Sequence, residues 1–171
     1  MPDVAHGIER AAHPPVHVAP PPRPVGAAPH AAGVRYVAAG SPAGYIPCDV
    51  RNAYHLATSS LTGAGQTIAI VDYSDDPSIA SDLTAFSSDL GLPAAPFSKR
   101  LLGAPPVDSG WTHEITLDVE WAHAIAPGAS IVLIETASSS VGTGVSNGLI
   151  QGLDYAVGSA VNADVVSMSW A

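Results

Sequence analysis

Short apolar runs alternate with amphipathic segments along the chain from about residue 67 onward. Three runs have the length and continuous apolar character of buried strands: Thr67–Asp72 (TIAIVD), Ser130–Thr136 (SIVLIET) and Asp164–Ser169 (DVVSMS). The segments between and beside them predict three helices: Asp76–Leu90, Thr112–Ala126 and Gly144–Ser159. Strand, helix, strand, helix, strand in this order predicts an α/β fold with a parallel sheet and helices on both of its faces.

Local signals support the helix ends. Asp76 is expected to cap the first helix, with Pro77 in its first turn and Gly91 at its end. The last predicted strand ends two residues before the end of the chain, and no helix follows to cover it. Because a strand of this composition needs burial on both faces, we expect an incomplete sheet at the C-terminus, as in a fragment.

The first part of the chain has a different composition. Ten of the 16 prolines precede Arg51, and residues 11–32 are mostly Pro, Ala, His and Val. We therefore predict a disordered tail or linker over residues 1–42 and a folded domain over residues 43–171. The prolines exclude the helix that a metal site at His13 and His17 would need.

Charge and composition remove several classes of function. With 6 basic and 15 acidic side chains the net charge is −9, so nucleic acid and anionic membranes are not expected partners. Forty-seven per cent of the residues are hydrophobic, yet no apolar run reaches the length of a membrane span. Cys48 is the single cysteine, which excludes an internal disulfide. After Arg100 there are seven carboxylates and no Lys or Arg, which fits either acidic working conditions or a soluble acidic surface.

The segment from Trp111 to Ala129 carries the clearest chemical signal. Glu114 and Asp118 are one helical turn apart, so their side chains are neighbours. At about 100° per residue both fall in the arc that holds Trp121 and Ile125. Two close carboxylates in an apolar setting are expected to share a proton and to act as a general base at a pH where histidine is already protonated. The alternative is a solvated acidic pair near a helix start.

Residues around the pair leave further alternatives open. Thr116, Glu120 and His123 fall on the opposite arc of the helix, so we expect His123 at the surface, while His113 is ambiguous. Trp111 and Trp121 line either a substrate cleft or the core.

A second acidic cluster follows the first predicted strand. Asp72, Asp75 and Asp76 are placed to hold Mg²⁺, as in receiver-like domains, although no lysine stands near them in the sequence. Gly63 and Gly65 precede the strand, so a dinucleotide-binding loop is excluded.

Several ordered motifs resemble the sedolisin (serine-carboxyl peptidase) family. They are GYIPCDVRNAYHL, GAGQTIAIVDYSDDP, DLTAFSSDLGLP, WTHEITLDVEWAHAIAPGASI and ADVVSMSW, and they extend from Gly44 to Trp170. The resemblance implies that residues 43–171 are the N-terminal portion of a peptidase domain with a subtilisin-like fold. It also implies a secreted serine-type endopeptidase that acts on proteins and peptides at acidic pH.

The resemblance assigns roles to two residues. Glu114 matches the general base that takes the proton from the nucleophilic serine, and Asp118 matches the acid that hydrogen-bonds that glutamate. The family's nucleophilic serine in a Gly-Thr-Ser turn, its oxyanion aspartate and its calcium-binding loop have no match in this chain, and neither Ser167 nor Ser169 stands in such a turn. We therefore expect the chain alone to be inactive, monomeric and without a cofactor.

Two other functions stay open at this point. The first is a catalytically inactive chain that serves in binding or regulation. The second is the magnesium-dependent domain built on Asp72, Asp75 and Asp76.

Overall fold

The computed structural model describes residues 45–142, 144 and 146–170. The tail predicted for residues 1–42 lies outside the described residues, as do His13 and His17. The described part contains one sheet of four parallel strands in the order β2-β3-β1-β4. The strands are β1 (Thr67–Tyr73), β2 (Phe97–Leu102), β3 (Ser130–Thr136) and β4 (Val165–Ser167).

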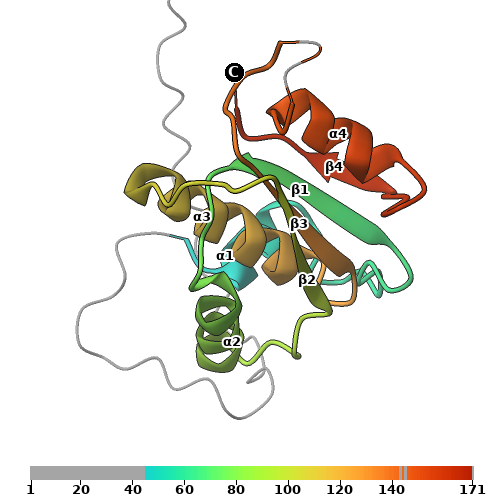
Figure 1. Cartoon of the computed structure of the whole chain (residues 1–171). Helices are drawn as coiled ribbons and strands as arrows, with labels where there is room; N and C mark the ends of the chain where they lie inside the picture. Colours follow the sequence, from blue (N-terminus) through green and yellow to red (C-terminus); the bar gives the residue numbers. More distant parts are fainter. Residues whose placement is uncertain (1–44, 143, 145, 171) are drawn as a thin grey trace, which may run out of the picture. The chain divides into compact units, whose positions relative to one another are not determined.

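Four helices surround the sheet: α1 (Pro47–Ala53), α2 (Ile79–Leu90), α3 (Ser109–Ile125) and α4 (Leu149–Val157). Helices α2 and α3 lie on one face and α4 on the other (Figure 1). The α/β fold with a parallel sheet and helices on both faces is thus confirmed. No helix among the described residues is long and apolar enough to cross a membrane.

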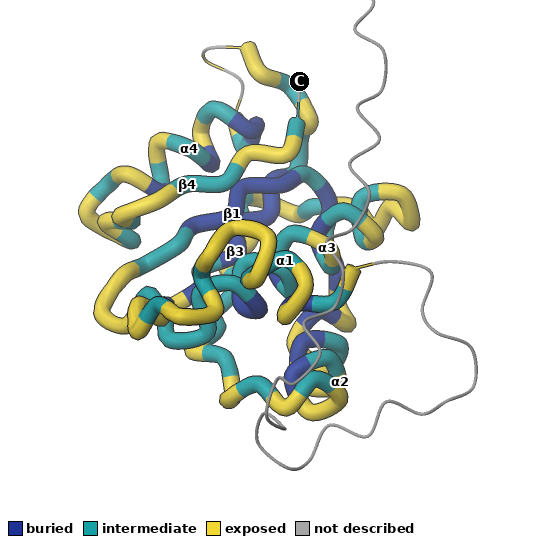
Figure 2. Tube along the Cα trace, turned by 180° about the vertical axis from the view of Figure 1, so that it is seen from behind, coloured by how far each residue is buried: buried dark blue, intermediate teal, exposed yellow. Residues whose placement is uncertain are grey.

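Alternation along the strands divides the core into two parts, one on each side of the sheet. Ile70 of β1 packs with Leu83 of α2 and Ile115 of α3, and all three are buried. Val71, the next residue of β1, packs on the other side with Leu149 of α4. Figure 2 shows the buried positions concentrated along β1 and β3, in the middle of the sheet. The central strands are therefore covered on both faces, as their apolar sequences require.

The outer strands differ from the sequence expectation. β3 has the predicted bounds, but β4 is shorter than predicted and lies at an edge of the sheet, where Val165 is 55% exposed. The composition of this strand favours burial on both faces, and its edge position leaves it partly exposed. β2, the other edge strand, was not predicted, because Lys99 and Arg100 interrupt its apolar pattern.

The helix ends follow local hydrogen bonds. Asp76 was predicted to be the N-cap of α2, but the N-cap is Ser78. The backbone N–H of Ser78 donates to Asp76 Oδ1 at 2.9 Å. Gly91 ends α2 in the left-handed region at φ 66°, as predicted. α3 begins at Ser109 rather than Thr112, because the Asp108 carboxylate accepts from two N–H groups of its first turn.

Two further differences concern short segments. α4 begins at Leu149, not at Gly144, because Gly144 (φ 84°) and Asn147 (φ 57°) adopt left-handed backbone conformations. Helix α1 was not predicted; its Arg51 side chain donates to the Ile125 carbonyl oxygen at 2.7 Å. A cation at this position satisfies an unpaired carbonyl at the end of α3.

The close approach of α4 to the sheet depends on Gly152. A Cβ atom at this position would lie 2.6 Å from Val71 Cγ1 and 3.0 Å from Thr136 Cγ2. We expect Gly152→Val to lower the free energy of unfolding by about 1–3 kcal/mol in urea denaturation, because the helix must move off the sheet. The exposed Val157→Ala on the same helix is the control and should change it by less than about 0.5 kcal/mol. Equal effects of the two substitutions would contradict this explanation.

Candidate functional site

The predicted acid pair lies on one flank of α3. Of the four residues that α3 buries, Ile115, Val119 and His123 are spaced by one turn, and the fourth is Ala124. Glu114 and Asp118 each precede a buried position, and both are half-buried. The buried arc is therefore centred on Ile115 and Val119. The acid pair lies at the edge of this arc, whereas the sequence analysis had placed it inside.

Asp72, at the end of β1, faces this pair. Ile68, Ile70 and Asp72 alternate along β1 toward the side of the sheet that α3 covers. The Asp72 side chain is fully buried, and neither of its carboxylate oxygens has a hydrogen-bond partner among the described residues. Burial raises the pKa of Asp72 to about 7, and the charges of Asp118, Glu114 and Glu135 contribute to the rise. We call Asp72, Glu114 and Asp118 the acid trio.

The acid trio brings one fully buried carboxyl group together with two half-buried ones. Burial, together with the charges of Asp118 and Glu114, favours the protonated form of Asp72 by raising its pKa. A protonated Asp72 has an O–H group to donate, and Asp118 Oδ2 is a buried acceptor with no partner in the described part of the chain. Glu114 is half-buried and lies beside the fully buried Asp72 and the half-buried Asp118.

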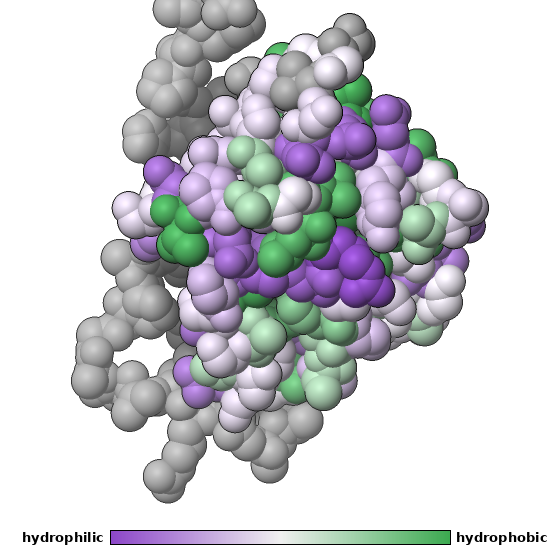
Figure 3. All heavy atoms as spheres, in the orientation of Figure 1, coloured by the Kyte–Doolittle hydropathy of each residue, from purple (hydrophilic) through white to green (hydrophobic). Residues whose placement is uncertain are grey.

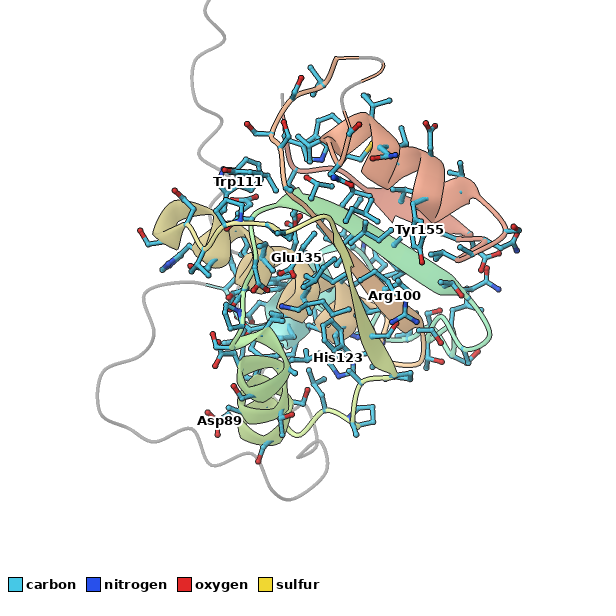
Figure 4. All side chains as sticks on the ribbon, in the orientation of Figure 1. Asp89, Arg100, Trp111, His123, Glu135 and Tyr155 are labelled. Atoms are coloured by element: carbon cyan, nitrogen blue, oxygen red, sulfur yellow. The ribbon has the colours of Figure 1, made fainter. Side chains whose placement is uncertain are left out.

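Aromatic side chains flank the start of α3. The rings of Tyr73, which follows Asp72, and Trp111 meet edge to face, with centroids 5.6 Å apart. Trp111 therefore lies beside the acid trio, one turn before Glu114, whereas Trp121 is half-buried further along α3. Figure 4 shows Trp111 near the N-terminal end of α3 and His123 toward its other end.

The prediction for His123 was wrong. Its side chain is fully buried, and Nε2 lies 2.9 Å from the Pro93 carbonyl oxygen. Because a carbonyl only accepts, Nε2 carries the proton and donates it. His123 thus ties α3 to the segment between α2 and β2, while His113 is exposed.

A second polar group occupies the neighbouring strand ends. Lys99, the only lysine in the chain, extends from β2, and its Nζ lies 2.9 Å from Glu135 Oε2 and 2.8 Å from the Asp76 carbonyl oxygen. The same Nζ forms an ion pair with Asp75. Glu135 is fully buried and accepts from the Asp76 backbone N–H at 2.7 Å. We call Lys99, Asp75, Asp76 and Glu135 the Lys99 cluster.

The pKa values of Glu135 and Lys99 are both shifted within the Lys99 cluster. Burial raises the pKa of Glu135 to about 7, although the Asp76 N–H and Lys99 lower it. Burial alone would lower the pKa of Lys99, but hydrogen bonds to Asp75 and Glu135, together with their charges, raise it above its ordinary value. A strongly hydrophilic band crosses the face of the molecule that carries β2 (Figure 3).

This cluster removes the basis of the magnesium hypothesis. No lysine is near Asp75 and Asp76 in the sequence, but β2 brings Lys99 between them and Glu135 in space, where its ammonium group contacts these acids. The Asp76 carboxylate is occupied by Ser78 and Thr116. No group of three or more His, Cys, Asp or Glu side chains in the described ranges could hold a metal ion.

The remaining candidate residues and one groove lie outside the acid trio and the Lys99 cluster. Cys48 is a free, exposed thiol on α1. Ser167 is half-buried in β4, and Ser169 is exposed beyond it. A groove of about 430 Å³ lies between α2 and the start of β2, and Leu83, Leu92 and Phe97 are among its lining residues.

Sequence reasoning assigned Asp72 to the wrong cluster and missed Lys99. The signal for Asp72 was present, because strand alternation places it on the face of Ile68 and Ile70, toward α3. Lys99 gave no such signal, since its role follows from the pairing of β2 with β3, which joins segments distant in sequence.

Comparison with known proteins supports a sedolisin-like fold. No protein-family profile matches the chain, and no curated protein matches it either. Among solved structures, Pseudomonas sedolisin (serine-carboxyl proteinase), complexed with two molecules of pseudo-iodotyrostatin, superimposes with a TM-score of 0.60 at 26% sequence identity. The match covers 74% of this chain and 35% of that one, so the chain spans about a third of the length of that enzyme. The described residues therefore share the fold of part of a serine-carboxyl proteinase.

Proposed function

We propose that this chain supplies the general-base part of a serine-type endopeptidase that acts on proteins and peptides at acidic pH. The observation that carries the proposal is the acid trio on a sedolisin-like fold. Glu114 and Asp118 are one turn apart on α3, beside the fully buried Asp72.

In this proposal Glu114 takes the proton from a serine hydroxyl as that oxygen attacks the peptide carbonyl, and Asp118 positions Glu114. A carboxylate base suits acidic conditions, because a histidine in this role would already carry its proton there. Asp72 retains its proton through the acidic range, since its pKa is raised to about 7, and so it adds no further negative charge beside the pair.

The nucleophile and the oxyanion group belong to a segment with no match in residues 1–171. The chain alone therefore has no peptidase activity in this proposal. The resemblance also implies calcium, in a loop outside these residues. Since the described residues contain no cluster that fits a metal ion, no step of the proposal uses one. Secretion is likewise part of the proposal by resemblance.

A chimera tests the proposal directly. Residues 44–170 replace the matching third of the Pseudomonas sedolisin chain, which then supplies the remaining two thirds. We expect the chimera to hydrolyse an acid-denatured protein at pH 4, and the 171-residue chain alone to leave it intact. A chimera that unfolds cooperatively, and so is folded, but shows no hydrolysis would count against the proposal.

A further inference from the structure

The two flanks of α3 contact different parts of the fold. Glu114 and Asp118 lie on the flank that faces Asp72 of β1. Thr116 and Glu120 lie on the other flank, toward the start of α2. The Thr116 hydroxyl shares its proton between the Thr112 carbonyl oxygen, at 2.8 Å within the helix, and Asp76 Oδ2, at 3.2 Å, and the charge of Asp82 acts on Glu120. The apolar stripe between the flanks packs on the sheet. The apolar stripe sets the approximate rotation of the helix about its axis, and directional polar contacts on its flanks constrain that rotation further.

The contact from Thr116 is made to a residue that is itself fixed. Asp76 is 1% exposed; its backbone N–H donates to Glu135 and its carbonyl oxygen accepts from Lys99. Lys99 thereby joins the connection between β1 and α2 to the end of β3. The Asp76 carboxylate, held at Oδ1 by Ser78, leaves Oδ2 for Thr116.

We propose that Lys99 is a positioning residue for the acid pair: it anchors Asp76 on β3, and Asp76, through Thr116, sets the rotation of α3 that presents Glu114 and Asp118 to Asp72. The inference rests on the proposed function, since it concerns the same two acids. It adds Lys99, Asp76 and Thr116, which lie outside the acid trio and affect it only through the position of α3.

Asp72 supplies the readout. The groups that face it are Asp118 and Glu114 from α3 and Glu135 from β3, and their charges contribute to its raised pKa. If α3 loses its fixed rotation, the acid pair spends less time near Asp72, and the Asp72 titration midpoint should fall. The midpoint can be measured in the full 171-residue chain by carboxyl ¹³C NMR, with no need for peptidase activity.

The first pair of variants changes no charge. We expect Thr116→Val, which removes the hydroxyl, to lower the Asp72 midpoint by about half a pH unit or more. Thr116→Ser retains the hydroxyl and should leave the midpoint near that of the parent. If the midpoint in Thr116→Val equals that of the parent, the inference is overturned.

A double-mutant cycle then tests Lys99 itself. If Lys99 acts through Asp76 and Thr116, the shift caused by Thr116→Val should disappear in a Lys99→Met background. Arg100→Met is the matched control: it removes an exposed cation from the adjacent position of β2, and the Thr116→Val shift should persist there. A shift of equal size in the Lys99→Met background, or its loss in the Arg100→Met background as well, overturns the role of Lys99.

Lys99→Met removes the cation beside a buried carboxylate and is the variant most liable to fail to fold. In that event Glu135→Gln, which retains side-chain size, replaces Lys99→Met in the cycle. The Thr116→Val shift should disappear in this background as well, and a shift of unchanged size would overturn the role of Lys99. The titration is independent of proteolysis, so this inference can fail while the chimera is active. Equally, the titration can give the expected shifts while the chimera is inactive.

Discussion

Lowering the pH from 8 to 5 should raise the free energy of unfolding of this chain by roughly 4 kcal/mol. The cause is the set of carboxyl groups whose pKa is raised in the folded state. Burial and the nearby charges of Asp118, Glu114 and Glu135 raise the pKa of Asp72 to about 7. Burial also raises the pKa of Glu135 to about 7, against the opposing effect of Lys99. Both side chains are fully buried.

The direction follows from proton binding. In the unfolded chain these groups lose their protons near pH 4, whereas in the folded chain they retain them up to about pH 7. Between these values the folded state binds more protons, so stability is gained as the pH falls through 7 and lost as it rises. Each group contributes about 2 kcal/mol over this interval. Glu120, whose pKa burial and Asp82 also raise to about 7, is partly exposed and adds less.

Urea denaturation at pH 5, 6, 7 and 8 measures the effect. Asp72→Asn removes one of the two buried titrations and should remove about half of the pH dependence. Asp89→Asn, an exposed acid on α2, is the matched control and should leave the dependence unchanged. A free energy of unfolding that is constant or increases from pH 5 to pH 8 would show that these carboxyls are not protonated in the fold.

The second large effect concerns catalysis. In the active chimera, Glu114→Gln should reduce kcat at pH 4 by about 10²–10⁴-fold, because a carboxamide cannot accept the serine proton. Since Gln has nearly the same size and Glu114 is only half-buried, the fold and KM should change little. The kinetics are measured with a chromogenic peptide under conditions that separate kcat from KM.

Glu120→Gln is the control for this substitution. It makes the same chemical change on the same helix, but on the flank that faces α2, and should reduce kcat by less than about tenfold. Full activity of Glu114→Gln would remove Glu114 from the role of base, even if the chimera itself is active.

The sequence was informative where local pattern decides structure. β1 and β3 are continuous apolar strands, and Gly91 ends α2, all as predicted. The spacing that makes Glu114 and Asp118 neighbours is a property of any helix, so their proximity could be predicted as well.

What the sequence could not supply depends on pairing between distant segments. The arc that α3 buries is decided by the sheet beneath it, so the helix periodicity placed His123 at the surface when it is buried. The role of Lys99 requires β2 to pair with β3, and an edge strand that carries two cations has no clear pattern. Asp72 is a different case: the sequence analysis grouped it with Asp75 and Asp76 by proximity, although the alternation along β1 already directs it to the face that α3 covers.

The position of β1 in the middle of the sheet has a consequence for how the protein is made. The contact from Thr136 of its neighbour β3 to Asp72 spans 64 residues, and the contact from Thr67 to Asp164, the residue before β4, spans 97 residues. At synthesis rates of about 5–20 residues per second, β1 waits roughly 3–13 seconds for its first partner and longer for its second. During that time an apolar segment of high β-propensity has both edges unpaired. Aggregation through this strand is therefore a hazard during synthesis, and a chaperone that covers Thr67–Tyr73 should raise the soluble yield.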